Sequence, residues 1–221
     1  MTISDLQQTV VVFDLDDTLY SESDYVRSGI RHVGTWLEKL CGADLQAQIA
    51  EAIVHPKEDW IGRLCTAANF PLAAKESLLW MYRLHAPEIS LTAECKQMLD
   101  RLEHRCMRVL VLTDGRGVTQ RIKLQALGLS RFRAYVSEDY QSEKPDALRF
   151  RAIEQDYPAK SYFYVGDNPR KDFIACNALG WTGVGLRGKG AIHSQDLSNV
   201  LPDALPNYWI DEWHELLELL C

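Results

Sequence analysis

Acidic residues recur along the chain directly after runs of apolar residues. Asp14 and Asp16 follow one such run, and Asp167 and Asp172 follow a later one. Carboxylates gathered without a cation would repel one another and raise their own pKa values, so the pattern is typical of a hard-cation site. Mg²⁺ prefers oxygen ligands and commonly shares them with substrate phosphate oxygens. These acids therefore indicate a magnesium site that receives a phosphorylated compound.

Asp14 and Asp16 are two positions apart, which also suits acid–base chemistry. In an extended chain their side chains project on the same side, whereas an added turn would present the backbone carbonyl of Asp16 to a metal. Two carboxyl groups in one pocket can act as nucleophile and general acid/base when their environments separate their pKa values. A plain turn or helix cap would also place Asp here, so the segment alone leaves both interpretations open.

The elements that must position these acids alternate between strands and helices. Apolar, β-branched runs predict strands at 9–14, 108–113, 134–137, 161–165 and 182–186. Apolar residues at helical spacing predict helices at 95–102, 118–127, 148–153 and 173–179. This alternation indicates an α/β fold with a doubly wound, mainly parallel sheet, in which ligands bind outside the carboxyl ends of the strands.

The stretch from 21 to 90 interrupts the alternation. It contains no strand-like run and shows apolar stripes at helical spacing, so we expect a helical subdomain at 21–90 inserted into an α/β core of 1–20 and 91–221. Four of its aromatic residues are candidates for substrate contact, although aromatic residues at helical spacing more often belong to a core. They are Trp36, Trp60, Trp80 and Tyr82.

Composition limits the partners and the compartment. The 221 residues include 24 Lys and Arg against 31 Asp and Glu, a net charge of −7 that argues against binding to nucleic acid or an anionic membrane. The first apolar run is cut off by Asp14 and follows no basic segment, so no signal peptide or membrane span is expected. The six cysteines form no C-x-x-C pair. We expect a cytoplasmic protein with reduced thiols, and the oligomeric state stays open.

Four segments resemble, in order, the motifs of the haloacid dehalogenase superfamily of phosphohydrolases, whose fold is a Rossmann-like α/β core. They are Asp14-Leu-Asp-Asp-Thr18, Thr113 at a strand end, Lys144 before Pro145, and Gly166-Asp167 with Asp172 shortly after. Each match alone is weak, whereas four in the family's order are specific. The resemblance spans nearly the whole chain, and the insertion stands where one branch of the family carries a helical cap.

The resemblance implies the role of each residue. Asp14 would attack phosphorus and form an aspartyl-phosphate, and Asp16 would protonate the leaving oxygen and then take a proton from water. The implied catalytic residues are Asp14, Asp16, Thr113 and Lys144. The implied Mg²⁺ ligands are Asp14, the Asp16 carbonyl and Asp167, with Asp172 holding a metal-bound water or Lys144. The implied phosphate-binding groups are the Thr113 hydroxyl, the Lys144 ammonium and the backbone N–H groups around Asp114 and Gly115.

Several positions also have a plain structural interpretation. Lys144 could be a solvated loop lysine, and Thr113 could simply fill the sheet. Tyr20 is a candidate hinge or cleft residue. The loop that holds Gly188, Gly190 and His193 could border the cleft, although a plain surface loop is the stronger interpretation.

Asp16 separates the reactions found within the superfamily. The dehalogenating members need neither a metal nor the second Asp, and the phosphonate-cleaving members replace it, so this chain is expected to be a phosphatase. The implied substrate is a small phosphorylated metabolite, a nucleoside monophosphate or a sugar phosphate. A phosphomutase and a non-catalytic binding or regulatory relative remain as alternatives.

Overall fold

A six-stranded sheet lies at the centre of the α/β part of the chain. The computed structural model describes residues 3–187 and 197–220, so Gly188, Gly190 and His193 lie outside the described residues. The strand order is β3-β2-β1-β4-β5-β6, and each neighbouring pair is parallel. The strands are β1 Thr9–Phe13, β2 Arg108–Thr113, β3 Ala134–Val136, β4 Ser161–Gly166, β5 Thr182–Leu186 and β6 Tyr208–Ile210.

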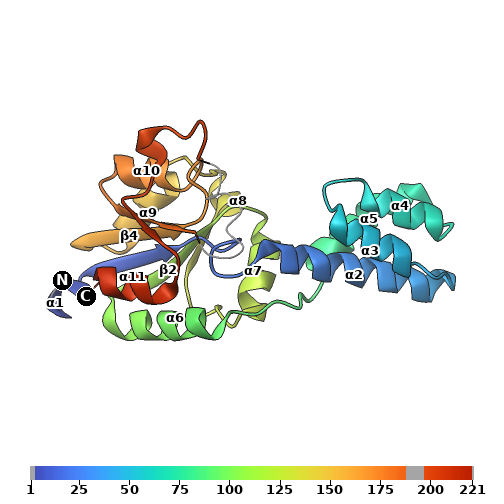
Figure 1. Cartoon of the computed structure of the whole chain (residues 1–221), viewed down its shortest axis with the longest axis horizontal. Helices are drawn as coiled ribbons and strands as arrows, with labels where there is room; N and C mark the ends of the chain where they lie inside the picture. The colour runs from blue at the N-terminus through green and yellow to red at the C-terminus, as the bar shows by residue number, and fades with distance from the viewer. Residues whose placement is uncertain (1–2, 188–196, 221) are drawn as a thin grey trace. The chain divides into compact units, whose positions relative to one another are not determined.

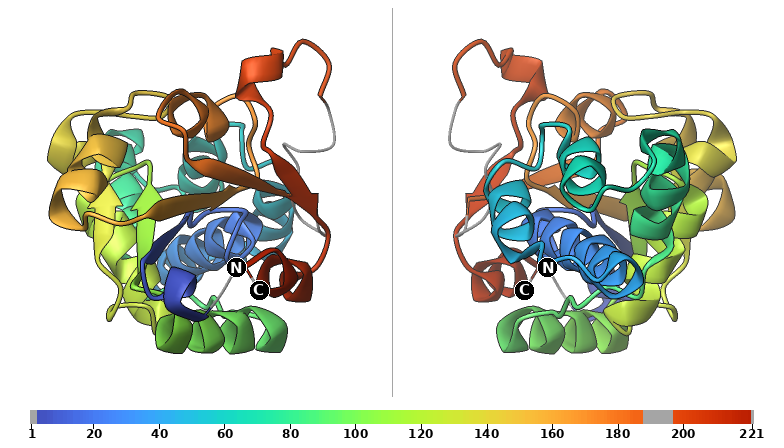
Figure 2. Two further views of the ribbon diagram at one scale, coloured as in Figure 1. Left: turned by 90° about the vertical axis from the view of Figure 1, so that its left-hand side faces the viewer. Right: turned by 90° about the vertical axis from the view of Figure 1, so that its right-hand side faces the viewer.

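Helices cover both faces of this sheet. Helices α6 and α11 lie on one face, and α9 and α10 lie on the other (Figures 1 and 2). The predicted α/β fold with a doubly wound parallel sheet is therefore confirmed. The helices of this part are α1 Ile3–Leu6, α6 Ala93–Arg105, α7 Gly117–Ala126, α8 Ser137–Tyr140, α9 Leu148–Asp156, α10 Phe173–Ala178 and α11 Trp213–Leu220, with a 3₁₀ turn at Pro202–Ala204.

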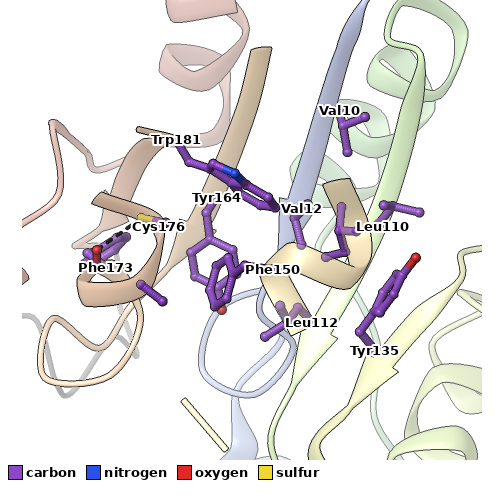
Figure 3. Packing of buried hydrophobic residues seen from close by; sticks show 12 residues of the cluster. Val10, Val12, Leu110, Leu112, Tyr135, Phe150, Tyr164, Phe173, Cys176 and Trp181 are labelled. Atoms are coloured by element: carbon purple, nitrogen blue, oxygen red, sulfur yellow. Dashed lines mark hydrogen bonds between the residues drawn. The ribbon is translucent and has the colours of Figure 1, made fainter. Parts of the chain in front are cut away.

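The central strand β1 packs on both sides because its side chains alternate between the two faces. Val10 and Val12 join an apolar cluster that also includes Phe150 of α9 (Figure 3). Phe13 meets the ring of Trp213 in α11, with ring centroids 6.2 Å apart. Burial on both faces explains why β1 is a continuous apolar run rather than an alternating one.

The chain divides into two compact units. One consists of residues 1–21, 90–120 and 128–221, and the other of residues 22–89 and 121–127. The second half of α7 belongs to the second unit. There Lys123 Nζ lies over the ring of Tyr25, 4.4 Å from its centroid. We refer to these as the α/β unit and the helical unit.

The helical unit has a core of its own. Its helices are α2 Glu22–Cys41, α3 Gln46–Val54, α4 Trp60–Ala67 and α5 Lys75–Leu84, with a 3₁₀ turn at Leu72–Ala74. Trp60 is buried in this core, whereas Trp36 and Trp80 each keep 38% of their surface exposed. At Gly34 a side chain would overlap Ile49, so the glycine lets α2 and α3 approach closely. No helix among the described residues is long and apolar enough to cross a membrane.

Candidate active site

Three neighbouring strands deliver polar side chains to one edge of the sheet. Asp14 follows β1, Thr113 ends β2, and Asp167 follows β4. Because β1 pairs with both β2 and β4, and all three run parallel, their carboxyl ends lie side by side. The strand order also reverses at β1, and ligands of doubly wound folds bind at such a switch point.

Lys144 is the central cation of this edge. Its Nζ donates hydrogen bonds to Asp14 Oδ1 and Asp172 Oδ1, both at 2.7 Å, and to the hydroxyl of Tyr164 at 3.1 Å. The side chains of Lys144, Asp14 and Asp172 are at most 9% exposed. The interpretation of Lys144 as a solvated loop lysine is therefore wrong.

Burial and charge shift the pKa values of this group. Burial raises the pKa of Asp14 to about 7; Lys144 opposes the rise, and Asp172 adds to it. Burial alone would lower the pKa of Lys144, but Asp14 and Asp172 raise it well above its usual value. Lys144 therefore stays charged and supplies a fixed positive charge beside Asp14.

Asp14, Asp167 and Asp172 form a group that fits a divalent cation. One carboxylate oxygen of each lies within 4.8 Å of the others. Asp167 accepts a hydrogen bond from the Thr18 hydroxyl at 3.3 Å, but its Oδ2 is buried and has no hydrogen-bond partner among the described residues. Burial, with Asp172 and Asp14 nearby, raises the pKa of Asp167 to about 8. A buried, unpartnered oxygen beside other carboxylates is suited to Mg²⁺.

Asp16 lies beside this group with both carboxylate oxygens engaged. The Tyr20 hydroxyl donates to Oδ1 at 2.5 Å, and Gln120 Nε2 donates to Oδ2 at 2.8 Å. Tyr20 was a candidate cleft residue on sequence grounds, but nothing in the sequence pointed to Gln120. The contact of Gln120 with Asp16 is visible only in the structure, because in the sequence a buried glutamine of a helix looks like any other polar helix residue.

The sequence of residues 11–185 matches the family of haloacid dehalogenase-like hydrolases. It belongs to that family. The predicted family and the predicted class of hydrolytic enzyme are therefore confirmed.

Individual relatives extend the comparison over almost the whole hydrolase. A glyceraldehyde 3-phosphate phosphatase of Methanopyrus kandleri is 26% identical over 95% of this chain and 96% of its own. The magnesium-bound HAD hydrolase YfnB of Bacillus subtilis superimposes with a TM-score of 0.66 at 18% identity, covering 96% of this chain and 98% of its own. A 2-haloacid dehalogenase of Pseudomonas syringae superimposes with a TM-score of 0.63 at 19% identity, covering 96% of this chain and 97% of its own. The two structural matches show a shared fold.

In this hydrolase both carboxylate oxygens of Asp172 accept hydrogen bonds from neighbouring residues. Its Oδ1 accepts from Lys144 and from Tyr164, and its Oδ2 accepts the backbone N–H of Asn168 at 2.8 Å. A Cβ at Gly166 would lie 2.5 Å from Asp172 Oδ2, so glycine is what lets this carboxylate approach β4. With donors on both oxygens, Asp172 suits the predicted role of partner to Lys144.

The Gly115 N–H, one of the backbone groups predicted to bind phosphate, and the side chain of Asp114 both have partners within the protein. The Gly115 N–H donates to Ser137 Oγ at 2.9 Å, so it would have to leave Ser137 to bind phosphate. Asp114 Oδ1 accepts from Arg149 Nη2 at 2.5 Å and from the Lys144 N–H at 3.2 Å. Asp114 thus connects the end of β2 to the loop that carries Lys144.

Arg149 is a structural residue of the site that sequence reasoning missed. It is fully buried on α9, and its Nη1 donates to the carbonyl oxygens of Thr113 at 2.8 Å and Tyr135 at 3.3 Å. One guanidinium therefore joins the last residue of β2, the middle residue of β3 and Asp114. An arginine in an amphipathic helix is ordinarily exposed, so nothing in the sequence distinguishes Arg149 from a surface residue.

Proposed function

We propose that this hydrolase is a magnesium-dependent phosphatase that removes phosphate from a small phosphorylated metabolite through an aspartyl-phosphate on Asp14. The observation that carries the proposal is the buried group around Asp14. A carboxylate paired with a charged lysine lies next to Asp167, whose Oδ2 is unpartnered. That combination supplies a nucleophile, positive charge for phosphate and a position for a cation.

In the first step a carboxylate oxygen of Asp14 forms a bond to phosphorus while the bond from phosphorus to the leaving oxygen breaks. Asp16 gives its proton to that oxygen, which departs as an alcohol. Lys144 stays positioned by Asp172 and stabilises the negative charge that develops on the phosphoryl oxygens. The Thr113 hydroxyl is the proposed donor from β2.

In the second step water attacks the phosphorus of the aspartyl-phosphate, and the Asp14 carboxylate leaves. Asp16, now ionised, accepts the proton of that water, so both residues return to their starting state. The proposed ligands of Mg²⁺ are Asp14, the Asp16 carbonyl and Asp167. When bound, Mg²⁺ neutralises charge on the phosphate and the carboxylates.

The substrate class rests on the relative and on the inserted segment. The similar glyceraldehyde 3-phosphate phosphatase makes a triose or sugar phosphate the first class to try. The helical segment 21–90 is proposed to be a cap that selects the leaving group, as its place in the sequence predicts. Nucleoside monophosphates are the second class.

The experiment is hydrolysis of p-nitrophenyl phosphate with Mg²⁺ and with EDTA. We expect activity that needs Mg²⁺ and falls by about a thousandfold or more in Asp14→Asn, because the nucleophile is lost. Ranking glyceraldehyde 3-phosphate, sugar phosphates and nucleoside monophosphates by kcat/KM would then identify the substrate class.

Asp139 provides the matched control, because it is an exposed aspartate of the α/β unit. Asp139→Asn should keep the wild-type rate. An inactive wild type in Mg²⁺, or an Asp14→Asn variant as active as wild type, would refute the phosphatase. Release of a phosphorylated isomer in place of inorganic phosphate would identify a phosphomutase instead.

A further inference from the structure

We propose that Gln120 and Tyr20 are positioning residues that orient the Asp16 carboxyl group toward the leaving oxygen of the substrate. The inference rests on the proposed function, in which Asp16 is the general acid. It concerns two residues that lie outside the four family motifs, and it predicts a dependence on the leaving group that a purely structural role would not produce.

The geometry around Asp16 restrains its carboxylate at both oxygens. Tyr20 lies four residues further along the same turn and donates to Oδ1 at 2.5 Å. Gln120 comes from the first part of α7 and donates to Oδ2 at 2.8 Å. Tyr20 is 6% exposed and Gln120 1% exposed, so water competes little with either hydrogen bond. Donors on both oxygens fix the plane of the carboxyl group.

Gln120 also connects Asp16 to the end of β2. Its Nε2 lies 2.7 Å from Thr113 Oγ1 and 2.8 Å from the carbonyl oxygen of Asp114. The Asp114 carbonyl oxygen can only accept, so the nitrogen of the amide must face it. By donating to Thr113 Oγ1, Gln120 occupies a lone pair of the hydroxyl oxygen. The Thr113 hydroxyl itself donates to the Asp114 carbonyl oxygen at 3.4 Å, a long hydrogen bond that it would exchange for one to a phosphoryl oxygen.

The opposite end of the Gln120 amide argues for a functional role. Its Oε1 is buried and has no hydrogen-bond partner among the described residues. An unpartnered buried acceptor destabilises the fold. A side chain that tolerates this loss while its Nε2 faces three acceptors of the predicted site is better explained by positioning than by packing.

The leaving oxygen provides the test. Phenyl phosphate and p-nitrophenyl phosphate have rings of similar size, but the nitro group makes p-nitrophenolate the better leaving group. Loss of a well-oriented general acid should therefore slow cleavage of phenyl phosphate more. The kcat/KM value is the parameter to compare, since it includes departure of the leaving group and not hydrolysis of the aspartyl-phosphate.

The experiment compares Gln120→Met and Tyr20→Phe with wild type on both esters in Mg²⁺. For Gln120→Met we expect kcat/KM to fall about ten- to a hundredfold on phenyl phosphate and less than about threefold on p-nitrophenyl phosphate. Tyr20→Phe, which removes one hydroxyl group, should show the same selectivity with a smaller loss. Asp16→Asn should show it most strongly.

Matched controls are Gln125→Met, an exposed glutamine of the same helix, and Tyr208→Phe, an exposed tyrosine. Both should keep wild-type values on both esters, and melting temperatures should show that all variants fold. Equal losses on the two esters, or no loss, would overturn the positioning role. Wild type that cleaves neither ester, or Asp14→Asn that cleaves both, would instead refute the phosphatase and the inference with it.

Discussion

In the α/β unit, buried charges gather at one edge of the sheet, whereas the helical unit keeps its carboxylates at its surface. Lys144 lies between Asp14 and Asp172 with almost no exposure. In the helical unit the comparable pair is Lys75 with Asp59, 2.5 Å apart, and those side chains are 41% and 63% exposed. No carboxylate is buried between residues 22 and 89, all of which the structure describes.

Buried charges and exposed charges differ in their energetic cost. Removing a charged group from water costs several kcal/mol, which an ion pair only partly recovers. An exposed pair costs little and contributes little. A fold therefore keeps buried carboxylates mainly where chemistry needs them. The buried group of Asp14, Lys144 and Asp172, referred to below as the Asp14 group, is such a place. At the surface of the helical unit, Asp59 instead caps α4 by accepting the Gly62 N–H.

Replacing Lys144 with methionine should have the largest effect of any substitution in the two units. The variant loses the charge that faces phosphate and leaves Asp14 and Asp172 without their counter-ion. We expect phosphatase activity to fall by about a thousandfold. The free energy of unfolding without Mg²⁺ should fall by about 3 to 5 kcal/mol. Steady-state kinetics and urea denaturation measure the two effects.

Lys75→Met is the matched variant in the helical unit. Its unfolding free energy should change by less than about 1 kcal/mol, because the pair is exposed to solvent. Its kcat/KM on p-nitrophenyl phosphate should stay at the wild-type value. Equal costs for the two lysines, in stability or in activity, would show that burial does not distinguish the two regions.

Arg149→Met tests a buried charge that does not face the Asp14 group. The substitution removes the donors to the carbonyl oxygens of Thr113 and Tyr135 and the partner of Asp114. We expect a loss of about 2 to 4 kcal/mol in the free energy of unfolding, since buried acceptors and one carboxylate lose their donors. Urea denaturation in the absence of Mg²⁺ measures it.

Arg131→Met is the control for this loss. Arg131 also makes hydrogen bonds to two acidic residues, Glu103 and Asp100, but 40% of its side chain is exposed. Its removal should cost less than about 1 kcal/mol. If Arg149→Met were as stable as Arg131→Met, the buried guanidinium would not be what joins β2 and β3 to Asp114.

Local sequence patterns were sufficient to predict most of the strands and helices and the polar residues at the strand ends. Apolar runs that end in Asp14, Thr113 and Asp167 identify strands and their polar ends, and parallel strands bring those ends together. Apolar residues at helical spacing likewise predict most of the helices. These inferences use only local patterns and a general property of parallel sheets.

Gln120 and Arg149 could not be found from local patterns. Gln120 meets Asp16 across 104 positions, and Arg149 meets Asp114 across 35, so the contacts exist only after the sheet has formed. A polar residue in an amphipathic helix predicts exposure, and here tertiary structure overrides that pattern. The order of the strands and the three-residue strand β6 were likewise beyond local reasoning, since so short a segment carries little pattern.

The smallest expected effect lies in the helical unit, at its buried histidine. His85 Nδ1 donates to the Tyr82 carbonyl oxygen at 2.6 Å, so in the neutral ring Nε2 accepts from Ser28 Oγ at 3.0 Å. Burial lowers the pKa of His85; the Tyr82 carbonyl and Glu88 oppose this, whereas His32 and Lys123 add to it. The folded helical unit therefore favours the neutral imidazole.

Protonation of His85 should destabilise the protein below neutral pH. The unfolded chain has the higher histidine pKa, so it binds more protons as the pH falls below about 6.5, and unfolding becomes easier. The neutral, buried His85 contributes its full stabilisation above that pH, and this contribution is lost as the pH falls toward the lowered pKa of the folded state.

The experiment compares the free energy of unfolding of wild type and His85→Gln at about pH 8 and about pH 5.5. We expect His85→Gln to lose less of this free energy than wild type, by no more than about 1 kcal/mol. His55→Gln, in which an exposed histidine of the same unit is replaced, is the control variant against which His85→Gln is compared. If the free energy of unfolding depended on pH in the same way in wild type and in His85→Gln, protonation of His85 would not contribute to the loss of stability at low pH.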